Sequence, residues 1–229
     1  DPMLMLDMDR AVDRVLKSIK DRERIRIVTD YDVDGTTSSL ILQSVCRLLG
    51  GGDLIDYHIP DRFVEGYGFS DMVAKKAISD GIQLILTADI GVRDHSAVQL
   101  SRDSGVDVII CDHHLPAGES VPQDAHAVLC PPQIGCNYPN PALAACGVSL
   151  KFAEALLGHS AQYRHRTEDI LRSMMKIAAI GTIADVVSLA TLENRAIVSL
   201  GLAELSNPQY QHQPGLQALL DVSRVPNGQ

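Results

Sequence analysis

The chain has 229 residues, a length within the range of one large α/β domain, and 45% of them are hydrophobic, which is enough to bury a core. Twenty Lys and Arg residues against 29 Asp and Glu residues give a formal net charge of −9, which argues against a protein that grips nucleic acid through a broad basic face. Aromatic residues make up 4% of the chain and Trp is absent, so a platform for stacking bases is not expected, whereas the charge is compatible with an acidic site for divalent cations.

The first part of the chain alternates between short β-branched runs and longer amphipathic segments. The runs predict strands at 25–29, 54–59, 84–88, 106–111 and 125–129. The longer segments predict helices at 36–49, 70–80 and 94–104, with Ser70 as the N-cap of the second. The third and fourth runs are almost continuously apolar, which is typical of parallel strands covered on both faces.

The second part of the chain is predicted to be helical after Pro131-Pro132. The expected helices span 147–157, 167–184, 193–206 and 214–220. The fold class is therefore α/β, with a doubly wound, mostly parallel five-stranded sheet and a helical C-terminal segment. We expect one domain over 1–229, of which about 1–130 form the sheet portion and about 131–229 the helical portion.

Acidic and histidine residues directly follow three of the predicted strands. Ligands of an open α/β sheet bind at the carboxyl ends of the strands, so these side chains are expected to lie together. The residues are, in chain order, Asp30, Asp32, Asp34, Asp89, Asp112, His113 and His114. One more carboxylate, Asp185, ends the apolar helical run 177–184.

Such a cluster of carboxylates predicts bound cations. Two bare carboxylates ~4 Å apart repel each other by roughly 4 kcal/mol at an effective dielectric constant near 20, so several at one sheet edge are costly without a counter-ion. Oxygen ligands with one or two imidazoles suit Mn²⁺ or Mg²⁺, and the histidines favour Mn²⁺. Two such ions about 4 Å apart can activate water and stabilise the attacking and leaving oxygens of a phosphoryl transfer.

Simpler interpretations exist for single members of the set. A lone Asp after a strand is usually a helix cap or a turn residue, which is our interpretation of Asp71 and Asp94. An adjacent His pair in a loop is more often exposed than metal-bound. The Asp30-x-Asp32-x-Asp34 pattern is not an EF-hand, because position twelve of the loop is Ile41. The joint placement at strand ends is what favours a metal site.

The same residues resemble the motifs of the DHH phosphoesterases. Motifs I to IV of that family are similar to 30–38, 87–91, 112–114 and 181–187. Within the family, the chain most resembles the RecJ group of single-strand-specific DNA exonucleases, and the stretches that carry this resemblance are 60–68, 113–116 and 193–195. The resemblance implies a two-metal hydrolase that degrades single-stranded DNA 5′→3′ to 5′-mononucleotides in DNA repair and recombination.

The resemblance also implies a role for each matching residue. The implied ligands of one metal are Asp34, Asp89, His113 and Asp185, and those of the second are Asp32 and Asp89 with Asp30. Asp89 bridges the two metals, His114 lies near the scissile phosphate, and Asp112 supports the ligands from behind. Some members have a histidine where this chain has Val28, so a weaker second metal site is expected.

Substrate contacts implied by the resemblance are Arg62 and Arg195, which would bind phosphates. The expected partners are single-stranded DNA and, beyond it, a single-strand-binding protein and a helicase. Related proteins continue into a second, substrate-binding domain that this chain lacks. Two alternatives stay open: a DHH phosphodiesterase for short oligonucleotides or cyclic dinucleotides (or a pyrophosphatase), and a catalytically dead DHH scaffold.

The cysteines indicate the cellular compartment of the protein, and the first residues indicate whether the chain is part of a longer one. Cys46, Cys111 and Cys130 lie within apolar runs and no CxxC pair occurs, which predicts buried, reduced thiols of a cytoplasmic protein. Neither a signal peptide nor an apolar run of roughly 18 residues that could span a bilayer is present. The chain opens at Asp1-Pro2 and not at Met, which indicates a piece of a longer protein.

Overall fold

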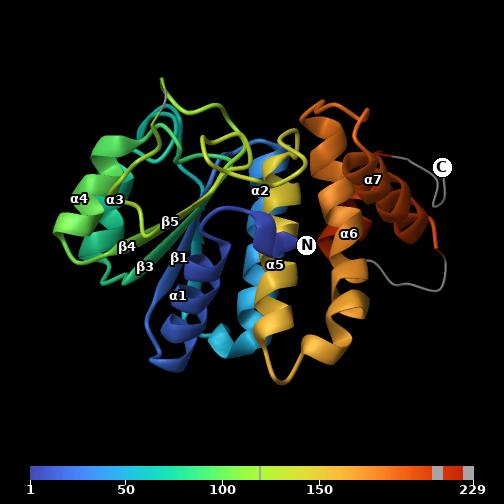
Figure 1. The fold of residues 1–229 in the computed structure, drawn as a ribbon, viewed down its shortest axis with the longest axis horizontal. Helices are drawn as coiled ribbons and strands as arrows, with labels where there is room; N and C mark the ends of the chain where they lie inside the picture. Colours follow the sequence, from blue (N-terminus) through green and yellow to red (C-terminus); the bar gives the residue numbers. More distant parts are fainter. Residues whose placement is uncertain (119, 208–213, 224–229) are drawn as a thin grey trace.

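The computed structural model describes residues 1–118, 120–207 and 214–223 and contains one five-stranded parallel sheet (Figure 1). The strands are β1 (Ile25–Thr29), β2 (Ile55–His58), β3 (Leu84–Ala88), β4 (Asp107–Cys111) and β5 (Ala127–Leu129). They lie in the order β2-β1-β3-β4-β5, and every neighbouring pair is parallel. The predicted fold class is confirmed, and each strand lies within its predicted run.

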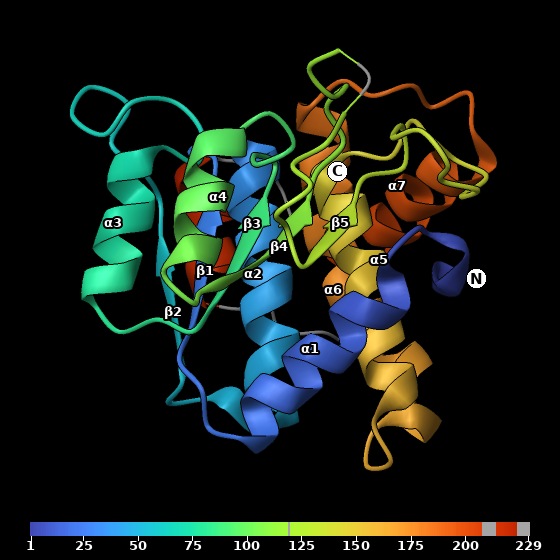
Figure 2. The same cartoon turned by 60° about the vertical axis from the view of Figure 1, so that its left-hand side comes forward.

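Helices cover both faces of the sheet. One face carries α3 (Asp71–Ser79) and α4 (His95–Asp103), and the other carries α1 (Met8–Lys20), α2 (Val33–Cys46) and α5 (Ala145–His159). Beyond α2 and α5 lie α6 (Thr167–Ala184) and α7 (Leu192–Leu205), and Figure 2 shows α1 beside α5. The remaining elements are α8 (Pro214–Ser223), a π turn at Arg47–Gly51 and 3₁₀ turns at Pro2–Leu4 and Arg164–Arg166.

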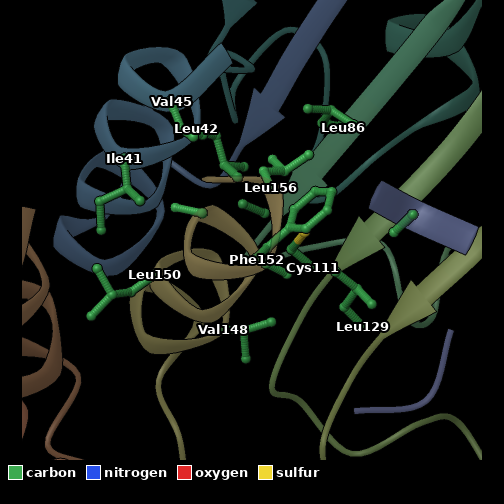
Figure 3. Close-up of a cluster of buried hydrophobic side chains, with 14 of the residues drawn as sticks. Ile41, Leu42, Val45, Leu86, Cys111, Leu129, Val148, Leu150, Phe152 and Leu156 are labelled. Carbon is green, nitrogen blue, oxygen red and sulfur yellow. The ribbon is translucent and has the colours of Figure 1, made fainter. Parts of the chain in front are cut away.

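Two apolar clusters form because alternate side chains of each strand point to opposite faces. In β3, Leu84 and Leu86 pack towards α2 and α5, whereas Ile85 packs towards α3 and α4. Figure 3 shows Leu86 together with Leu42 of α2 and Phe152 of α5 as members of the first of these clusters. Burial on both faces explains why β3 and β4 are almost continuously apolar.

The strand order reverses between β1 and β3. After β1 the chain runs to β2 at one edge of the sheet and then returns to β3 on the other side of β1. At such a switch point the connections after the two strands diverge to opposite faces, which leaves a crevice at their carboxyl ends. Asp30 follows β1 and Asp89 follows β3, so both lie at this crevice.

Two details differ from the sequence-based expectation. No element was predicted for residues 1–24, yet α1 buries Met8, Ala11, Val12 and Val15 at helical spacing. The helix after β1 begins at Val33, three residues earlier than predicted, because its first turn is capped by an aspartate.

The cysteines and the helix lengths agree with expectation. All five cysteines are free thiols, and Cys46, Cys111 and Cys130 are buried as predicted. Within the described ranges, no helix combines the length and apolarity needed to cross a membrane.

Candidate metal centre

The loop after β1 supplies three aspartates. Asp32 is the N-cap of α2, and its Oδ1 accepts a hydrogen bond from the Gly35 amide at 2.9 Å. Asp30 is buried beneath this turn and accepts from the Tyr31 amide at 2.8 Å. A Cβ atom at Gly35 would collide with the backbone of Asp30, so only glycine allows the chain to turn this tightly.

Asp34 lies in the first turn of α2, and its side chain is fully buried. Its Oδ2 accepts from the Ala145 amide at 2.7 Å, and its Oδ1 accepts from the Cys146 amide at 2.8 Å. These amides belong to the first turn of α5, where unpaired N–H groups and the helix dipole favour a negative charge. The start of α5 therefore fixes this carboxylate in one position.

Asp89 follows β3 in an unusual conformation. Its φ is 64°, in the left-handed region that non-glycine residues seldom adopt. Its amide donates to Cys111 O at 3.0 Å, which continues the pairing of β3 with β4 and anchors the residue. The side chain is buried, yet its Oδ1 has no hydrogen-bond partner among the described residues.

Asp112 organises the residues after β4. Its Oδ1 accepts from the amides of His113 and His114 at 2.7 and 3.1 Å and lies 2.8 Å from His114 Nδ1, while its Oδ2 accepts from the Val92 amide at 3.0 Å. Burial opposes the charged form, but the hydrogen bonds and the charge of His114 outweigh it and lower the pKa of Asp112. The carboxylate thus orients His114 and leaves the Nε2 atom of that ring available.

His113 is the point at which the acidic residues converge. Its Nε2 lies 3.2 Å from Asp89 Oδ1, 3.8 Å from Asp185 Oδ2 and 3.9 Å from Asp34 Oδ2. The close approach to Asp89 lacks hydrogen-bond alignment, so Nε2 is also unpaired within the described part of the chain. Burial disfavours the imidazolium, but the nearby carboxylates outweigh it and raise the pKa of His113 to about 9.

The donor set fits two divalent cations. Donor atoms of Asp34, His113 and Asp185 lie within 4.8 Å of one another, and so do those of Asp30, Asp32 and Asp89. Burial raises the pKa of Asp30, Asp89 and Asp185, and a neighbouring carboxylate adds to the shift at each. His113 Nε2 and Asp89 Oδ1 are buried and have no hydrogen-bond partner among the described residues. Buried polar atoms normally have a partner, and a metal ion bound between them would supply one. Carboxylate and imidazole donors suit Mn²⁺, and the all-oxygen group suits Mg²⁺ or Mn²⁺.

The two predicted phosphate contacts differ in position. The Arg62 guanidinium lies 4.8 Å from the ring centroid of Tyr31, a residue that stands between two aspartates of the β1 loop. Arg195 is exposed on α7, directly after the buried Asn194. The structure thus brings Arg62 beside the cluster, whereas within the described residues no hydrogen bond or ion pair joins the Arg195 side chain to the cluster.

A hollow of about 230 Å³ adjoins the cluster and contains residues that the sequence did not single out. Its lining includes Asp89 and His114 together with Tyr67 and Arg93. Burial and the nearby Asp30 raise the pKa of Tyr67 to about 12. Tyr67 lies in the stretch 60–68 that resembles RecJ, so this motif could have identified it as a site residue. No sequence motif marks Arg93.

The two aspartates interpreted as caps or turn residues have other partners. Asp94 occupies the N-cap position of α4, but its carboxylate accepts from the Phe69 amide at 2.9 Å and does not cap the helix. Asp71 lies in the first turn of α3, after the N-cap Ser70, and accepts from Ser96 Oγ at 3.1 Å. Asp94 therefore ties the loop before α3 to the start of α4.

Comparison with known proteins identifies the family of this chain. The family model for the DHH family, N-terminal domain, matches residues 24–182. The single-stranded-DNA-specific exonuclease RecJ of Bacillus subtilis (strain 168) is 39% identical over 223 residues, which cover 97% of this chain and 26% of that protein. The RecJ exonuclease of Dickeya dadantii (strain 3937) is 36% identical over 228 residues, which cover 97% of this chain and 38% of that protein.

A solved structure shares the fold and carries a metal. The crystal structure of exonuclease RecJ bound to manganese superposes with a TM-score of 0.79 at 27% identity, covering 97% of this chain and 53% of that one. This chain spans between 26% and 38% of the length of the two RecJ relatives named above. On the family match, the motif residues and the fold together, the chain belongs to the DHH family and is similar to the corresponding part of the RecJ exonucleases.

Proposed function

We propose that this chain carries the catalytic centre of a metal-dependent phosphodiesterase that degrades single-stranded DNA 5′→3′ to 5′-mononucleotides, in DNA repair and recombination. The observation that carries the proposal is the convergence of His113 with Asp34, Asp89 and Asp185 at the β1/β3 switch point. Similar proteins named single-stranded-DNA-specific exonucleases support the substrate class. The RecJ structure bound to manganese supports the cofactor.

The residues divide between two ions. Asp34, His113 and Asp185 would hold one, Asp30 and Asp32 the other, and Asp89 would bridge them. When bound, the two cations would supply the charge that activates a water and offsets the developing charge on the phosphate. Since Val28 stands where some family members have a histidine, oxygen atoms alone would form the second site, which we expect to be the weaker one.

His114 is proposed to act on the scissile phosphate. His114 Nδ1 donates to Asp112, so Nε2 is the ring nitrogen left to contact the phosphate. The hydrogen bond to Asp112 also raises the pKa of His114. A raised pKa favours the protonated form of the ring. The ring can then stabilise charge on the phosphate or donate a proton to the leaving oxygen.

We propose that a domain outside this chain shares in binding the DNA strand. Arg62 beside Tyr31 is placed to contact a phosphate, and Arg195 stays a prediction of the resemblance. The net charge of −9 supports a second, substrate-binding domain as the source of most strand affinity. Contacts with a single-strand-binding protein and a helicase stay predictions, as does the cytoplasmic location, which the five free thiols support.

Hydrolysis of end-labelled DNA tests the proposal. We expect Mn²⁺-dependent release of mononucleotides from the 5′ end of single-stranded DNA, slower cleavage of duplex DNA, and no cleavage in chelator or with Asp89→Ala. Preferential cleavage of dinucleotides or cyclic dinucleotides, or of pyrophosphate, would support the alternative substrates. Absence of any cleavage by a folded, Mn²⁺-loaded chain would support an inactive scaffold, although such scaffolds lose motif carboxylates and this chain retains them.

A further inference from the structure

Asn194, the second residue of the third stretch that resembles RecJ, has a fully buried side chain with three hydrogen bonds. Its Nδ2 donates to Ala142 O at 2.7 Å and to Ser188 O at 2.9 Å, and its Oδ1 accepts from Asn140 Nδ2 at 2.9 Å. Every hydrogen of the side-chain amide is therefore used. Nothing in the proposed catalytic chemistry requires this residue.

The two carbonyls that Asn194 binds lie on two different segments, and each segment is connected to a different residue of the metal site. Ala142 lies three residues before Ala145, whose amide donates to Asp34. Ser188 lies three residues after Asp185. One side chain thus ties together the loop that fixes Asp34 and the turn that carries Asp185, and both carboxylates face the same nitrogen of His113.

The turn after Asp185 needs such support. Val186 has a φ of 60°, and the left-handed conformation is strained for a β-branched residue. The residue is 85% exposed, so packing does not hold it in place. Strained backbone persists only where the surroundings determine it, and the bond from Asn194 to Ser188 O supplies that constraint two residues further on.

The neighbouring Glu193 also contacts the segment before α5. It accepts from Tyr138 Oη at 2.7 Å and from Asn140 Nδ2 at 3.1 Å, and it lies 3.2 Å from Lys151 Nζ. Asn140 therefore contacts both residues at the start of α7. Several hydrogen bonds, at Tyr138, Asn140 and Ala142, thus hold the segment before α5 against the start of α7.

We propose that Asn194 is a positioning residue that sets the separation of Asp34 and Asp185 and so the affinity of the site they share with His113. The inference rests on the proposed metal site. Residues that orient metal ligands from behind typically change metal affinity by about 10- to 100-fold when replaced. A residue that only stabilised the α6–α7 connection would lower the melting temperature and leave the metal affinity of the folded chain unchanged.

Calorimetric titration of Mn²⁺ into metal-free chain separates the two roles. Asn194→Asp is nearly isosteric but sets a carboxylate against two carbonyls, and Asn194→Ala removes all three bonds. We expect each to bind Mn²⁺ about tenfold or more weakly than the original chain, at a temperature where circular dichroism shows the variant folded. Should both unfold, Asn194→Ser keeps one hydroxyl donor, one bond closer to the backbone, and is expected to show a smaller loss in the same direction.

Gln43→Glu is the matched control. Gln43 is buried in the third turn of α2, its Nε2 donates to Ser39 Oγ at 3.0 Å, and the change is again from amide to carboxylate. It should lower the melting temperature while Mn²⁺ affinity stays at the original value. Folded Asn194 variants that bind Mn²⁺ with unchanged affinity would overturn the positioning role. An original chain that binds no Mn²⁺ would instead overturn the proposed metal site itself.

Discussion

The carboxylate of Asp34 accepts a hydrogen bond from the backbone amide of Cys146 at 2.8 Å, across 112 residues of the chain. With the second bond, from Ala145, it joins the first turn of α2 to the first turn of α5. Asp89 is buried to a similar degree, but one of its oxygens is unpaired in the described structure. Two carboxylates of one cluster should therefore affect stability in opposite directions.

Substitution by asparagine tests this contrast in metal-free protein. Asp34→Asn turns an acceptor into a donor that faces a backbone amide, so it should cost about 1–3 kcal/mol of unfolding free energy. Asp89→Asn removes a buried carboxylate at which burial and the nearby Asp34 outweigh the attraction of His113, so it should leave stability unchanged or increase it. Urea unfolding in chelator at pH 8 measures both. An equal loss of stability in the two variants would contradict the assigned contacts.

Stability of the metal-free chain should fall as pH rises. The pKa of Asp89 is raised by burial, and that of His113 is raised to about 9 by the carboxylates around it, against the effect of burial. Both groups therefore bind protons more tightly in the folded chain. The stability they contribute is complete below their ordinary pKa values and is lost as pH rises towards 9.

Saturating Mn²⁺ should abolish this fall, because bound metal replaces the protons of the folded chain. Urea midpoints at intervals from pH 5 to 9, with chelator and with Mn²⁺, give both curves. Asp89→Asn should flatten the metal-free curve, since that position no longer titrates. A metal-free chain whose stability rises steadily over this range would show that the raised pKa values are not those of the folded state.

Replacement of His114 should separate chemistry from metal binding. His114→Ala is expected to lower single-turnover hydrolysis by ~10²–10⁴-fold while Mn²⁺ affinity stays near the original value, because Asp112 holds Nδ1 and neither proposed ligand set includes His114. Asp112→Asn should shift the alkaline limb of the rate profile to lower pH, since the bond to Asp112 is the main cause of the raised pKa of His114. A His114→Ala variant with native turnover would remove that residue from the mechanism.

DNA binding by this chain should depend weakly on salt. Each phosphate neutralised by Lys or Arg contributes about −0.7 to the slope of log K against log salt for single strands, so two contacts predict a slope of roughly −1 to −2. Arg62→Ala and Arg195→Ala should each make the slope shallower by about 0.7. Fluorescence anisotropy with Ca²⁺ in place of Mn²⁺ prevents cleavage during the measurement.

Arg166→Ala is the control for these two variants. Arg166 is exposed at the start of α6, whereas Asp185 follows the end of that helix, so its removal should leave the slope unchanged. An unchanged slope in Arg195→Ala alone would restrict the phosphate contact to Arg62. A steep slope that none of the three variants alters would place the binding surface elsewhere on the chain.

The strands and the carboxylates at their ends were predictable because each depends on local sequence. Buried parallel strands need apolar residues throughout, as in β3, and the position of Asp89 directly after that strand follows from the same run. Helix α1 also has a local signal, the helical spacing of Met8, Ala11, Val12 and Val15, so it too is predictable from local sequence.

Contacts between distant segments could not be predicted in the same way. The partners of Asn194 lie 52 residues away at Ala142 and 6 residues away at Ser188, and no periodicity encodes them. The left-handed φ values of Asp89 and Val186 likewise do not follow from local sequence: Asp tolerates that conformation without requiring it, and for the β-branched Val it is strained. The sequence indicated which residues form the site, but not what holds them in place.

The most direct test of the central claim is calorimetric titration of Mn²⁺ into metal-free chain at pH 7.5. The proposed site predicts two bound ions for each chain, the second weaker than the first, and a marked loss of both in Asp89→Ala because that residue bridges the pair. At 100 times the Kd, one such site should stabilise the fold by ~2.7 kcal/mol. No binding at millimolar Mn²⁺, or binding that Asp89→Ala leaves unchanged, would contradict a two-metal centre built on Asp89.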